Sequence, residues 1–306
     1  MENHPVVQVS ALHKRYGSTV AVDEVSFEVR EGEIFGLIGP NGAGKTTTME
    51  CVEGLRRPDR GRITVLSLDP VRDARGLQNR IGVQLQEAQL QKRITVWEAV
   101  DFWASLYATP VDGARLLEQL GLGDKRRAWF MTLSGGQKQR LFIALALMND
   151  PEVVFLDELT TGLDPQARRA IWELVRGIRE RGKTVLLTTH LMEEAERLCD
   201  RVAIIERGRI IDMGSPDELV GRHCPERSVT LATDVAGAGD RFRAIPGVGA
   251  VTQQDGRFTI RGSGDDLVTD VIQCLSESGM RVREFRTELP TLEDVFLKLT
   301  GHAIRD

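Results

Sequence analysis

The chain has 306 residues, more than one average domain, so its length predicts a core domain with a smaller domain appended. Hydrophobic residues make up 41% and charged residues 28%, which is ordinary for a folded protein and excludes the disordered and fibrous classes. The 40 basic and 45 acidic residues give a net charge of -5, so the chain has no global attraction for nucleic acid. We expect no nucleic-acid partner.

Cysteine spacing and hydropathy narrow the class of protein further. The four cysteines form no C-x-x-C pair, so neither a zinc site nor a disulfide framework is predicted. No apolar run approaches the roughly 20 residues that a membrane-spanning helix needs. The N-terminus also lacks the basic start and apolar centre of a secretion signal. We expect a protein of the reducing cytoplasm that does not itself cross a membrane.

Strand signals dominate the first part of the chain. Val6–Leu12 and Val20–Val29 are rich in β-branched residues and predict an antiparallel pair ahead of a buried strand at Ile34–Ile38. Further strands alternate with helices, which predicts a parallel α/β core that binds ligands beyond the carboxyl ends of its strands. These strands are Ile81–Leu85, Val153–Leu156, Val185–Thr189 and Val202–Ile205, and the helices include Gln166–Arg181 and Met192–Asp200.

Helix-start signals locate a helical insertion in this core. Thr95 with Glu98 three positions later forms a capping box, and Asp164 before Pro165 is a good N-cap before a favoured first helical residue. The pattern from Gln86 to Met148 is nearly all helical. We predict a helical subdomain at about residues 87–150.

The pattern changes near Gly221, where we place the boundary between a core α/β domain at 1–221 and an accessory domain at 222–306. Val248–Gln254 and Arg257–Arg261 flank Asp255-Gly256, a dipeptide suited to a tight hairpin turn. The other predicted elements are a strand at Ser228–Thr233, a helix at Asp265–Ser278, a strand at Met280–Phe285 and a closing helix at Thr291–Thr300. They predict a small α+β domain of the order βαββαβ.

Two apolar stripes are predicted on the helices of this domain. The helix Asp265–Ser278 should carry one on a single face, formed by Leu267, Val268, Val271, Ile272 and Leu275. The stripe of the closing helix must be covered by its own domain or by a partner, and it comprises Leu292, Val295, Phe296 and Leu299. No motif of catalytic residues falls in this domain, so we expect it to act in structure or regulation, with pairing of two core domains as the expected role.

A phosphate-binding loop follows the strand Ile34–Ile38. The sequence fits G-x-x-x-x-G-K-S/T and leads into a helical segment, as the mechanism requires. Lys45 should reach the β- and γ-phosphates of ATP, and the Thr46 hydroxyl should bind Mg²⁺. The predicted nucleotide-binding residues are Gly39, Pro40, Asn41, Gly42, Ala43, Gly44, Lys45, Thr46 and Thr47.

Two carboxylates follow the buried strand pattern Val153–Leu156, so both should emerge at the edge of the sheet where a ligand binds. Asp157 suits coordination of Mg²⁺, and Glu158 suits polarisation of an attacking water. Acidic residues are common at the ends of strands, so the pair alone is weak evidence for a site. The phosphate loop in the same chain strengthens the assignment.

The segment Leu133, Ser134, Gly135, Gly136 and Gln137 precedes a helical run. It resembles the LSGGQ signature of ABC ATPases, and Ser134 with the N–H groups of the glycines would form a second anion site at a helix N-terminus. The resemblance implies that this site serves the nucleotide of a second cassette. It also implies a phosphate-loop NTPase (RecA-like) core with an antiparallel β subdomain and an inserted helical subdomain.

The resemblance runs from residue 6 to about 220 and assigns further positions in the family's order. Tyr16 matches the aromatic residue that stacks on adenine, and Asp164 matches the loop at the dimer interface. Gln86 matches the glutamine that senses Mg²⁺ and water, although Gln84 lies nearby, and His190 matches the switch histidine. The chain departs from the family at Leu159, where proline is usual.

The tail Leu289–Gly301 is similar to the end of bacterial drug-resistance ABC subunits, such as those exporting anthracycline antibiotics. The resemblance implies an ATPase subunit that forms a head-to-tail homodimer at the cytoplasmic face of the membrane and contacts the membrane only through a separate transmembrane permease. The expected activity is export of a drug, antibiotic or other amphipathic compound. The alternative is a soluble ABC ATPase that acts on ribosomes or DNA.

Overall fold

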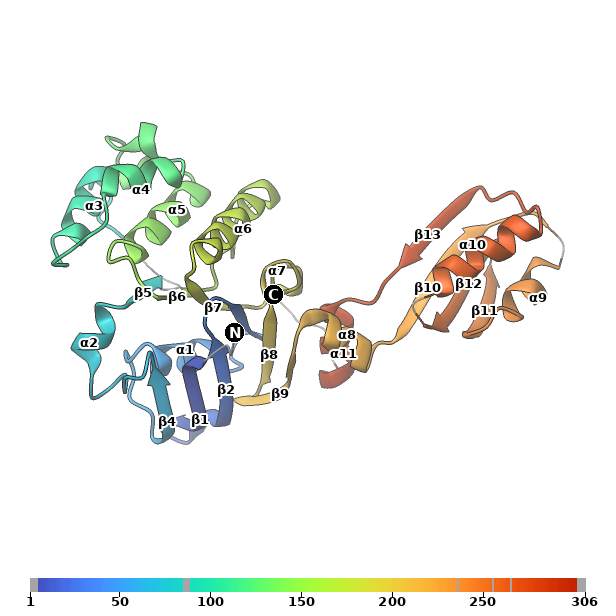
Figure 1. The fold of residues 1–306 in the computed structure, drawn as a ribbon, viewed down its shortest axis with the longest axis horizontal. Coiled ribbons are helices and arrows are strands. Elements are labelled where there is room, and N and C mark those ends of the chain that lie inside the picture. The colour runs from blue at the N-terminus through green and yellow to red at the C-terminus, as the bar shows by residue number, and fades with distance from the viewer. Residues whose placement is uncertain (1–4, 85–88, 236, 255, 265, 302–306) are drawn as a thin grey trace. The chain divides into compact units, whose positions relative to one another are not determined.

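The computed structural model describes residues 5–84, 89–235, 237–254, 256–264 and 266–301. The chain divides between Pro216 and Asp217 into two compact units (Figure 1). The predicted boundary at Gly221 falls inside helix α8 (Pro216–His223). None of the helices within the described ranges is long and apolar enough to span a bilayer.

A six-stranded sheet forms the centre of the first unit. Its order is β5-β6-β7-β3-β8-β9, and all neighbours are parallel except the final antiparallel pair. The strands are β3 (Ile34–Ile38), β5 (Ile81–Gln84), β6 (Val153–Asp157), β7 (Thr184–Thr189), β8 (Arg201–Glu206) and β9 (Arg209–Gly214). Every residue of β3, β6 and β7 is buried, which explains why these strands are almost continuous hydrophobic runs. The predicted parallel α/β core is confirmed.

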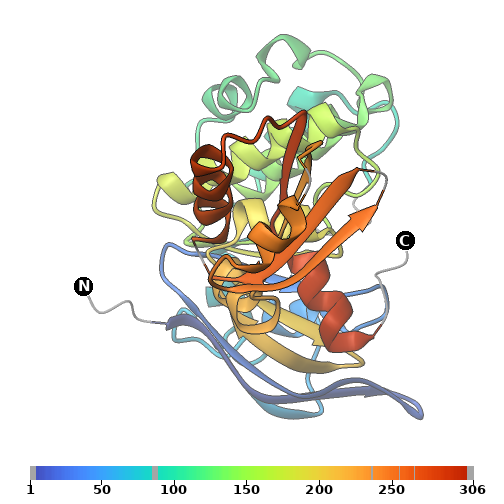
Figure 2. The same cartoon turned by 90° about the vertical axis from the view of Figure 1, so that its right-hand side faces the viewer.

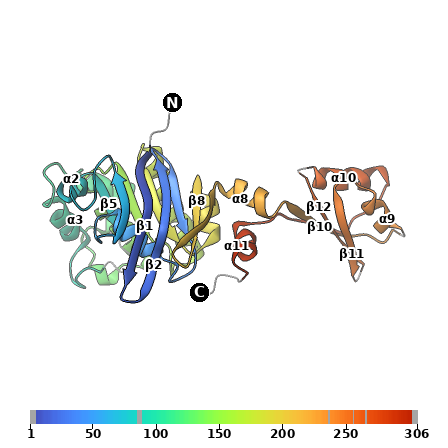
Figure 3. The ribbon, with the colours of Figure 1, turned by 90° about the horizontal axis from the view of Figure 1, so that it is seen from below.

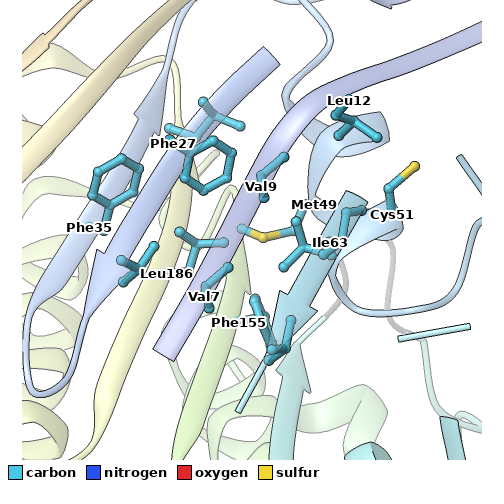
Figure 4. Close-up of a cluster of buried hydrophobic side chains, with 14 of the residues drawn as sticks. Val7, Val9, Leu12, Phe27, Phe35, Met49, Cys51, Ile63, Phe155 and Leu186 are labelled. Carbon is cyan, nitrogen blue, oxygen red and sulfur yellow. The ribbon is translucent and has the colours of Figure 1, made fainter. Parts of the chain in front are cut away.

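A three-stranded antiparallel sheet packs against this centre, in the order β2-β1-β4. Its strands are β1 (Pro5–Tyr16), β2 (Thr19–Arg30) and β4 (Arg60–Val65), of which β4 was not predicted. Figure 4 shows the core that joins the layers, where Phe27 stacks on Phe35 with ring centroids 5.4 Å apart. Met49 comes from the helix after the phosphate loop, so this core also fixes that helix.

Helices complete the first unit. They are α1 (Lys45–Val52), α2 (Ala74–Gln78), α3 (Val96–Ala104), α4 (Gly113–Gln119), α5 (Gly135–Ala146), α6 (Pro165–Glu180) and α7 (Met192–Leu198), with short 3-10 turns at Gly123–Lys125 and Phe130–Thr132. The capping box of Thr95 and Glu98 is present at α3, and Asp164 caps α6 through Gln166 N–H. Helices α3, α4 and α5 contact one another, which fits the predicted helical insertion.

The second unit contains a four-stranded antiparallel sheet in the order β11-β12-β10-β13 (Figure 2). Its α/β part follows the predicted order βαββαβ, and helices α9 and α10 lie on one face of the sheet (Figure 3). The elements are β10 (Glu226–Ala232), α9 (Ala238–Arg243), β11 (Val248–Gln254), β12 (Arg257–Ser263), α10 (Leu267–Glu277), β13 (Glu284–Glu288) and α11 (Leu292–Thr300). Asp255 of the predicted turn lies outside the described residues.

Two predictions for this unit are wrong in detail. The last strand starts at Glu284 rather than Met280, because Met280 turns into the hydrophobic core instead. Ile272 is 51% exposed, since Val271 and Leu275 already occupy the side of α10 that faces the sheet. Helix α11 lies beside α8, where Lys298 Nζ donates to the carbonyl of His223 at 2.6 Å (Figure 1). Its Leu292, Val295 and Phe296 are fully buried within the chain but do not belong to the core of the sheet.

Candidate nucleotide-binding and hydrolysis site

The phosphate loop connects the carboxyl end of β3 to the N-terminus of α1. Gly44 precedes the helix in a left-handed conformation, with φ 103°, and a Cβ there would lie 2.4 Å from the carbonyl oxygen of Ala21. A Cβ on Gly39 would lie 2.1 Å from the carbonyl oxygen of Ile205. Glycine is therefore required at both positions by close backbone packing. The N–H groups in the first turn of α1 are oriented as an anion site requires.

Lys45 is the first residue of α1 and is only 4% exposed. Its Nζ donates to the carbonyls of Gly39 at 2.9 Å and Pro40 at 3.0 Å, and lies 3.5 Å from Glu158 Oε1. Burial lowers the pKa of the ammonium group, while the nearby Glu158 carboxylate opposes that shift. A cation surrounded by acceptors next to a helix N-terminus is the arrangement that a phosphate group fits.

Glu158 and His190 meet beside Lys45. The Nδ1 atom of His190 lies 3.5 Å from Glu158 Oε1, the same oxygen that faces Lys45. Glu158 has φ 46°, a left-handed conformation that is rare outside glycine, and its N–H donates to the Thr188 carbonyl and hydroxyl at 3.1 Å each. The neighbouring strand β7 therefore holds the Glu158 backbone in a strained conformation, which is typical of functional sites.

Asp157 ends strand β6 and is 4% exposed. Burial raises the pKa of its carboxyl group, and the hydroxyls of Thr188 and Thr46 oppose the shift by hydrogen bonding. Thr188 lies in the predicted strand Val185–Thr189, but the sequence indicated no role for it. The sequence could have indicated this contact, because Thr188 is a hydroxyl residue near the end of the strand that pairs with β6. The register of the two strands places Asp157 opposite Thr188.

The residues present fit a magnesium ion. A carboxylate at Asp157 and a hydroxyl at Thr46 are the hard oxygen ligands that Mg²⁺ prefers, with phosphate oxygens and water supplying the rest. Within the described ranges there is no cluster of three or more histidine, cysteine or acidic residues that could hold a metal alone. Gln86, the third predicted ligand, lies outside the described residues, whereas Gln84 ends strand β5 and is buried.

The signature segment lies at the start of α5. Ser134 caps the helix, with its Oγ accepting from Gln137 N–H at 3.3 Å and its own N–H donating to Gln137 Oε1 at 3.0 Å. A Cβ added to Gly136 would lie 3.1 Å from Ala167 Cβ, so the start of α5 packs tightly on the first turn of α6. The signature segment and the loop that leads to Asp164 are thus neighbours.

Tyr16 ends strand β1 and is 40% exposed. The guanidinium of Arg56 lies 5.2 Å from the centre of its ring, and Lys14 Nζ lies at 5.9 Å. An exposed aromatic face among cations can stack on a base, but these contacts equally describe a surface tyrosine. Leu159, which replaces the proline usual in the family, is buried at 2% exposure.

The parallel sheet and the phosphate loop at its edge define the chain as a phosphate-loop NTPase. A family model for "ABC transporter" matches residues 22–161, and a model for "ATP-binding protein DrrA1-3-like, C-terminal domain" matches residues 214–300. The chain belongs to the family of ABC transporter ATP-binding proteins and is the ATP-hydrolysing subunit of such a transporter. The alternative of an ATPase acting on ribosomes or DNA is not favoured.

Curated relatives extend over nearly the whole chain. It is 39% identical to Nod factor export ATP-binding protein I of Ralstonia nicotianae, covering 99% of this chain and 96% of the relative. It is 36% identical to daunorubicin resistance ATP-binding protein DrrA3 of Streptomyces coeruleorubidus, with 96% of each covered. Linearmycin resistance ATP-binding protein LnrL of Bacillus subtilis is 35% identical, with coverage of 98% and 100%.

Solved structures match the cassette. An ATP-binding subunit of an ABC transporter aligns with a TM-score of 0.64 at 28% identity, covering 71% of this chain and 92% of the other. The cbiO1 structure from Clostridium perfringens, part of the ABC transporter complex cbiONQ, aligns with a TM-score of 0.65 at 28% identity, covering 73% and 97%. The predicted fold class is confirmed.

Proposed function

We propose that the chain hydrolyses MgATP with Glu158 as the base that polarises the attacking water and His190 as the residue that orients it. The observation that supports this most is the meeting of Lys45 and His190 at one oxygen of Glu158, each 3.5 Å away. Lys45 and the loop N–H groups bind the phosphates, so the carboxylate lies beside the reacting phosphate. A carboxylate at that point accepts a proton from water as the nucleophile forms.

Thr46 and Asp157 are the proposed ligands of the magnesium ion, together with Gln86. The ion supplies charge neutralisation at the phosphates when it is bound. Thr188 holds Asp157 Oδ1 in place through its hydroxyl. Tyr16 is the proposed stacking residue for adenine.

Two copies of the chain are proposed to pair head to tail, with Leu133–Gln137 of each completing the nucleotide site of the other. The glycines of this segment expose N–H groups at a helix N-terminus, which favours an anion. Asp164 lies on the loop beside the signature and is the proposed interface residue. A chain with one phosphate loop needs only one anion site for its own nucleotide. Pairing explains why a second anion site is present, because that site would bind the nucleotide of the other copy.

Mixing two inactive variants tests this pairing. Ser134→Arg blocks the signature site and Lys45→Ala disables the phosphate loop, so each homodimer has no complete site. A heterodimer retains one, and partial recovery of ATP-driven dimerisation in the mixture is expected. Proven mixing without recovery would mean that the signature acts within its own chain.

The proposed transport activity is export of a drug, antibiotic or other amphipathic compound through a separate transmembrane permease, with the chain held by that permease at the cytoplasmic face of the membrane. The support comes from relatives named for daunorubicin resistance, linearmycin resistance and Nod factor export. The test is ATP-dependent uptake of daunorubicin into inverted vesicles that contain this chain together with its transmembrane permease. Transport that is equally fast with Glu158→Gln would contradict the coupling.

The accessory unit is proposed to act in cassette pairing, because every residue proposed to bind or hydrolyse nucleotide lies upstream of it. Deletion after Val220 is expected to keep ATP binding and to weaken ATP-driven dimerisation, measured by size-exclusion chromatography. Undiminished dimerisation of the truncated chain would rule out this role.

A further inference from the structure

Glu194 is a buried carboxylate that lies outside all the motifs described above. It is in helix α7, four positions after His190, and is 1% exposed. Burying a carboxylate is costly unless hydrogen bonds compensate for the lost water. Its Oε1 accepts two hydrogen bonds, one from Thr160 Oγ1 at 2.7 Å and one from Trp172 Nε1 at 2.9 Å.

The two donors come from different parts of the site. Thr160 is fully buried and lies two positions after Glu158, in the loop between β6 and α6. Trp172 is in the middle of α6, the helix that Asp164 caps. Glu194 therefore connects the loop that carries Glu158 to the helix that follows His190.

We propose that Glu194 is a positioning residue for hydrolysis, which fixes the loop after Glu158 through the Thr160 hydroxyl. This inference rests on the proposed roles of Glu158 and His190. Glu158 is held on its N-terminal side by the hydrogen bonds from its own N–H to Thr188. The Thr160 hydrogen bond fixes the other side, and a strained left-handed conformation such as that of Glu158 persists only where the surrounding structure holds it in place.

The turn beyond Thr160 depends on the same anchor. Thr161 N–H donates to the Glu158 carbonyl at 3.3 Å, and Leu163 N–H donates to the Thr160 carbonyl at 3.2 Å. A shift of the backbone at Thr160 should therefore also displace Glu158 before it and Asp164 after it. Misplacement of a catalytic group by about 1 Å can slow a reaction by about 100-fold, so a loosened loop lowers turnover without touching the phosphate contacts.

The test compares six variants of the full-length protein for ATP affinity, kcat for ATP hydrolysis and melting temperature. Thr160→Val removes only the hydroxyl, and Glu194→Leu removes the acceptor. Both are expected to lower kcat by about 10- to 100-fold with ATP affinity within about twofold of wild type. Glu194→Gln keeps an oxygen that can accept both bonds, so its kcat should stay within a few-fold.

Trp172→Phe is the matched control, because it deletes the other hydrogen bond to the same oxygen while Thr160 stays anchored. It is expected to lower the melting temperature and to leave kcat within about threefold of wild type. The double variant of Thr160→Val and Glu194→Leu should be no slower than the slower single variant, because both substitutions remove the same Thr160–Glu194 hydrogen bond.

Wild-type kcat in Thr160→Val would overturn the inference, even if Glu194→Leu does not fold. An equal loss of kcat in Trp172→Phe would also overturn it, because the cluster would then act through general stability. Glu158→Gln, measured in parallel, separates failure of the catalytic role proposed for Glu158 from failure of the positioning role proposed for Glu194. If Glu158→Gln retains turnover, the proposed catalytic role is wrong and the positioning role falls with it, whereas a dead Glu158→Gln with a fully active Thr160→Val refutes the positioning role alone.

Discussion

The carboxyl group of Glu53 makes the stability of the ATPase unit depend on pH. Glu53 follows the last residue of α1 and is 4% exposed, and its Oε1 has no hydrogen-bond partner among the described residues. Burial, followed by the charges of Asp157 and Glu50, raises the pKa of Glu53 from 4.5 to about 8. At neutral pH the folded protein therefore keeps this proton, whereas the unfolded chain has lost it.

The direction in which Glu53 changes the free energy of unfolding with pH follows from the difference between its folded and unfolded pKa. The folded state binds the proton more tightly, so the contribution is fully present below about pH 4.5 and is lost as the pH rises toward the folded pKa of about 8. One pKa unit corresponds to about 1.4 kcal/mol, so the free energy of unfolding should fall by about 3 kcal/mol between pH 5 and pH 7 from this group. Glu53→Gln replaces the carboxyl by a neutral group of similar shape and should remove that loss.

Urea unfolding of both proteins at pH 5, 6 and 7 measures the effect. The relevant transition is the one that added ATP shifts to higher urea, because ATP stabilises only the unit that binds it. The free energy of unfolding of Glu53→Gln minus that of wild type is expected to rise by about 3 kcal/mol over this range. Glu180→Gln makes the same change at an exposed position and should show no rise. A constant difference for Glu53→Gln would refute the reasoning.

Two further substitutions probe the phosphate loop and the closing helix. Lys45→Ala removes the buried ammonium ion, and the affinity for ATP in a fluorescent-nucleotide titration should fall by about tenfold or more, the effect of losing a charge-assisted contact. Unchanged affinity would be incompatible with the phosphate-loop assignment. Phe296→Asp places a charge at a fully buried position of α11 and should lower the melting temperature of the accessory unit. A variant that melts normally but loses pairing would instead make α11 an interface.

The sequence predicted those features that local pattern determines. Buried strands β3, β6 and β7 were found because each is a continuous apolar run, and Asp157 and Glu158 were placed at the sheet edge because parallel strands share that edge. Strand β4 was missed because arginines and a glycine interrupt its apolar pattern. Its three exposed residues, Arg60–Arg62, lie at the edge of a sheet, where apolar alternation is weak.

Long-range contacts account for the functional residues that the sequence did not indicate. Glu194 lies 34 positions from Thr160, and nothing in the local pattern of α7 distinguishes it from the exposed Glu193 beside it. Glu53 looks like a surface residue at a helix end until the packing of α1 against the sheet buries it. Such residues become visible only when the register between elements is known.

The most direct test of the central claim is ATP turnover by Glu158→Gln beside wild type in the presence of Mg²⁺. The substitution removes the carboxylate that faces Lys45 and His190 but leaves the phosphate loop intact. We predict unchanged ATP affinity, an ATP-bound dimer that persists, and a loss of about 100-fold or more in kcat, the contribution of a general base. Hydrolysis within a few-fold of wild type would contradict the account.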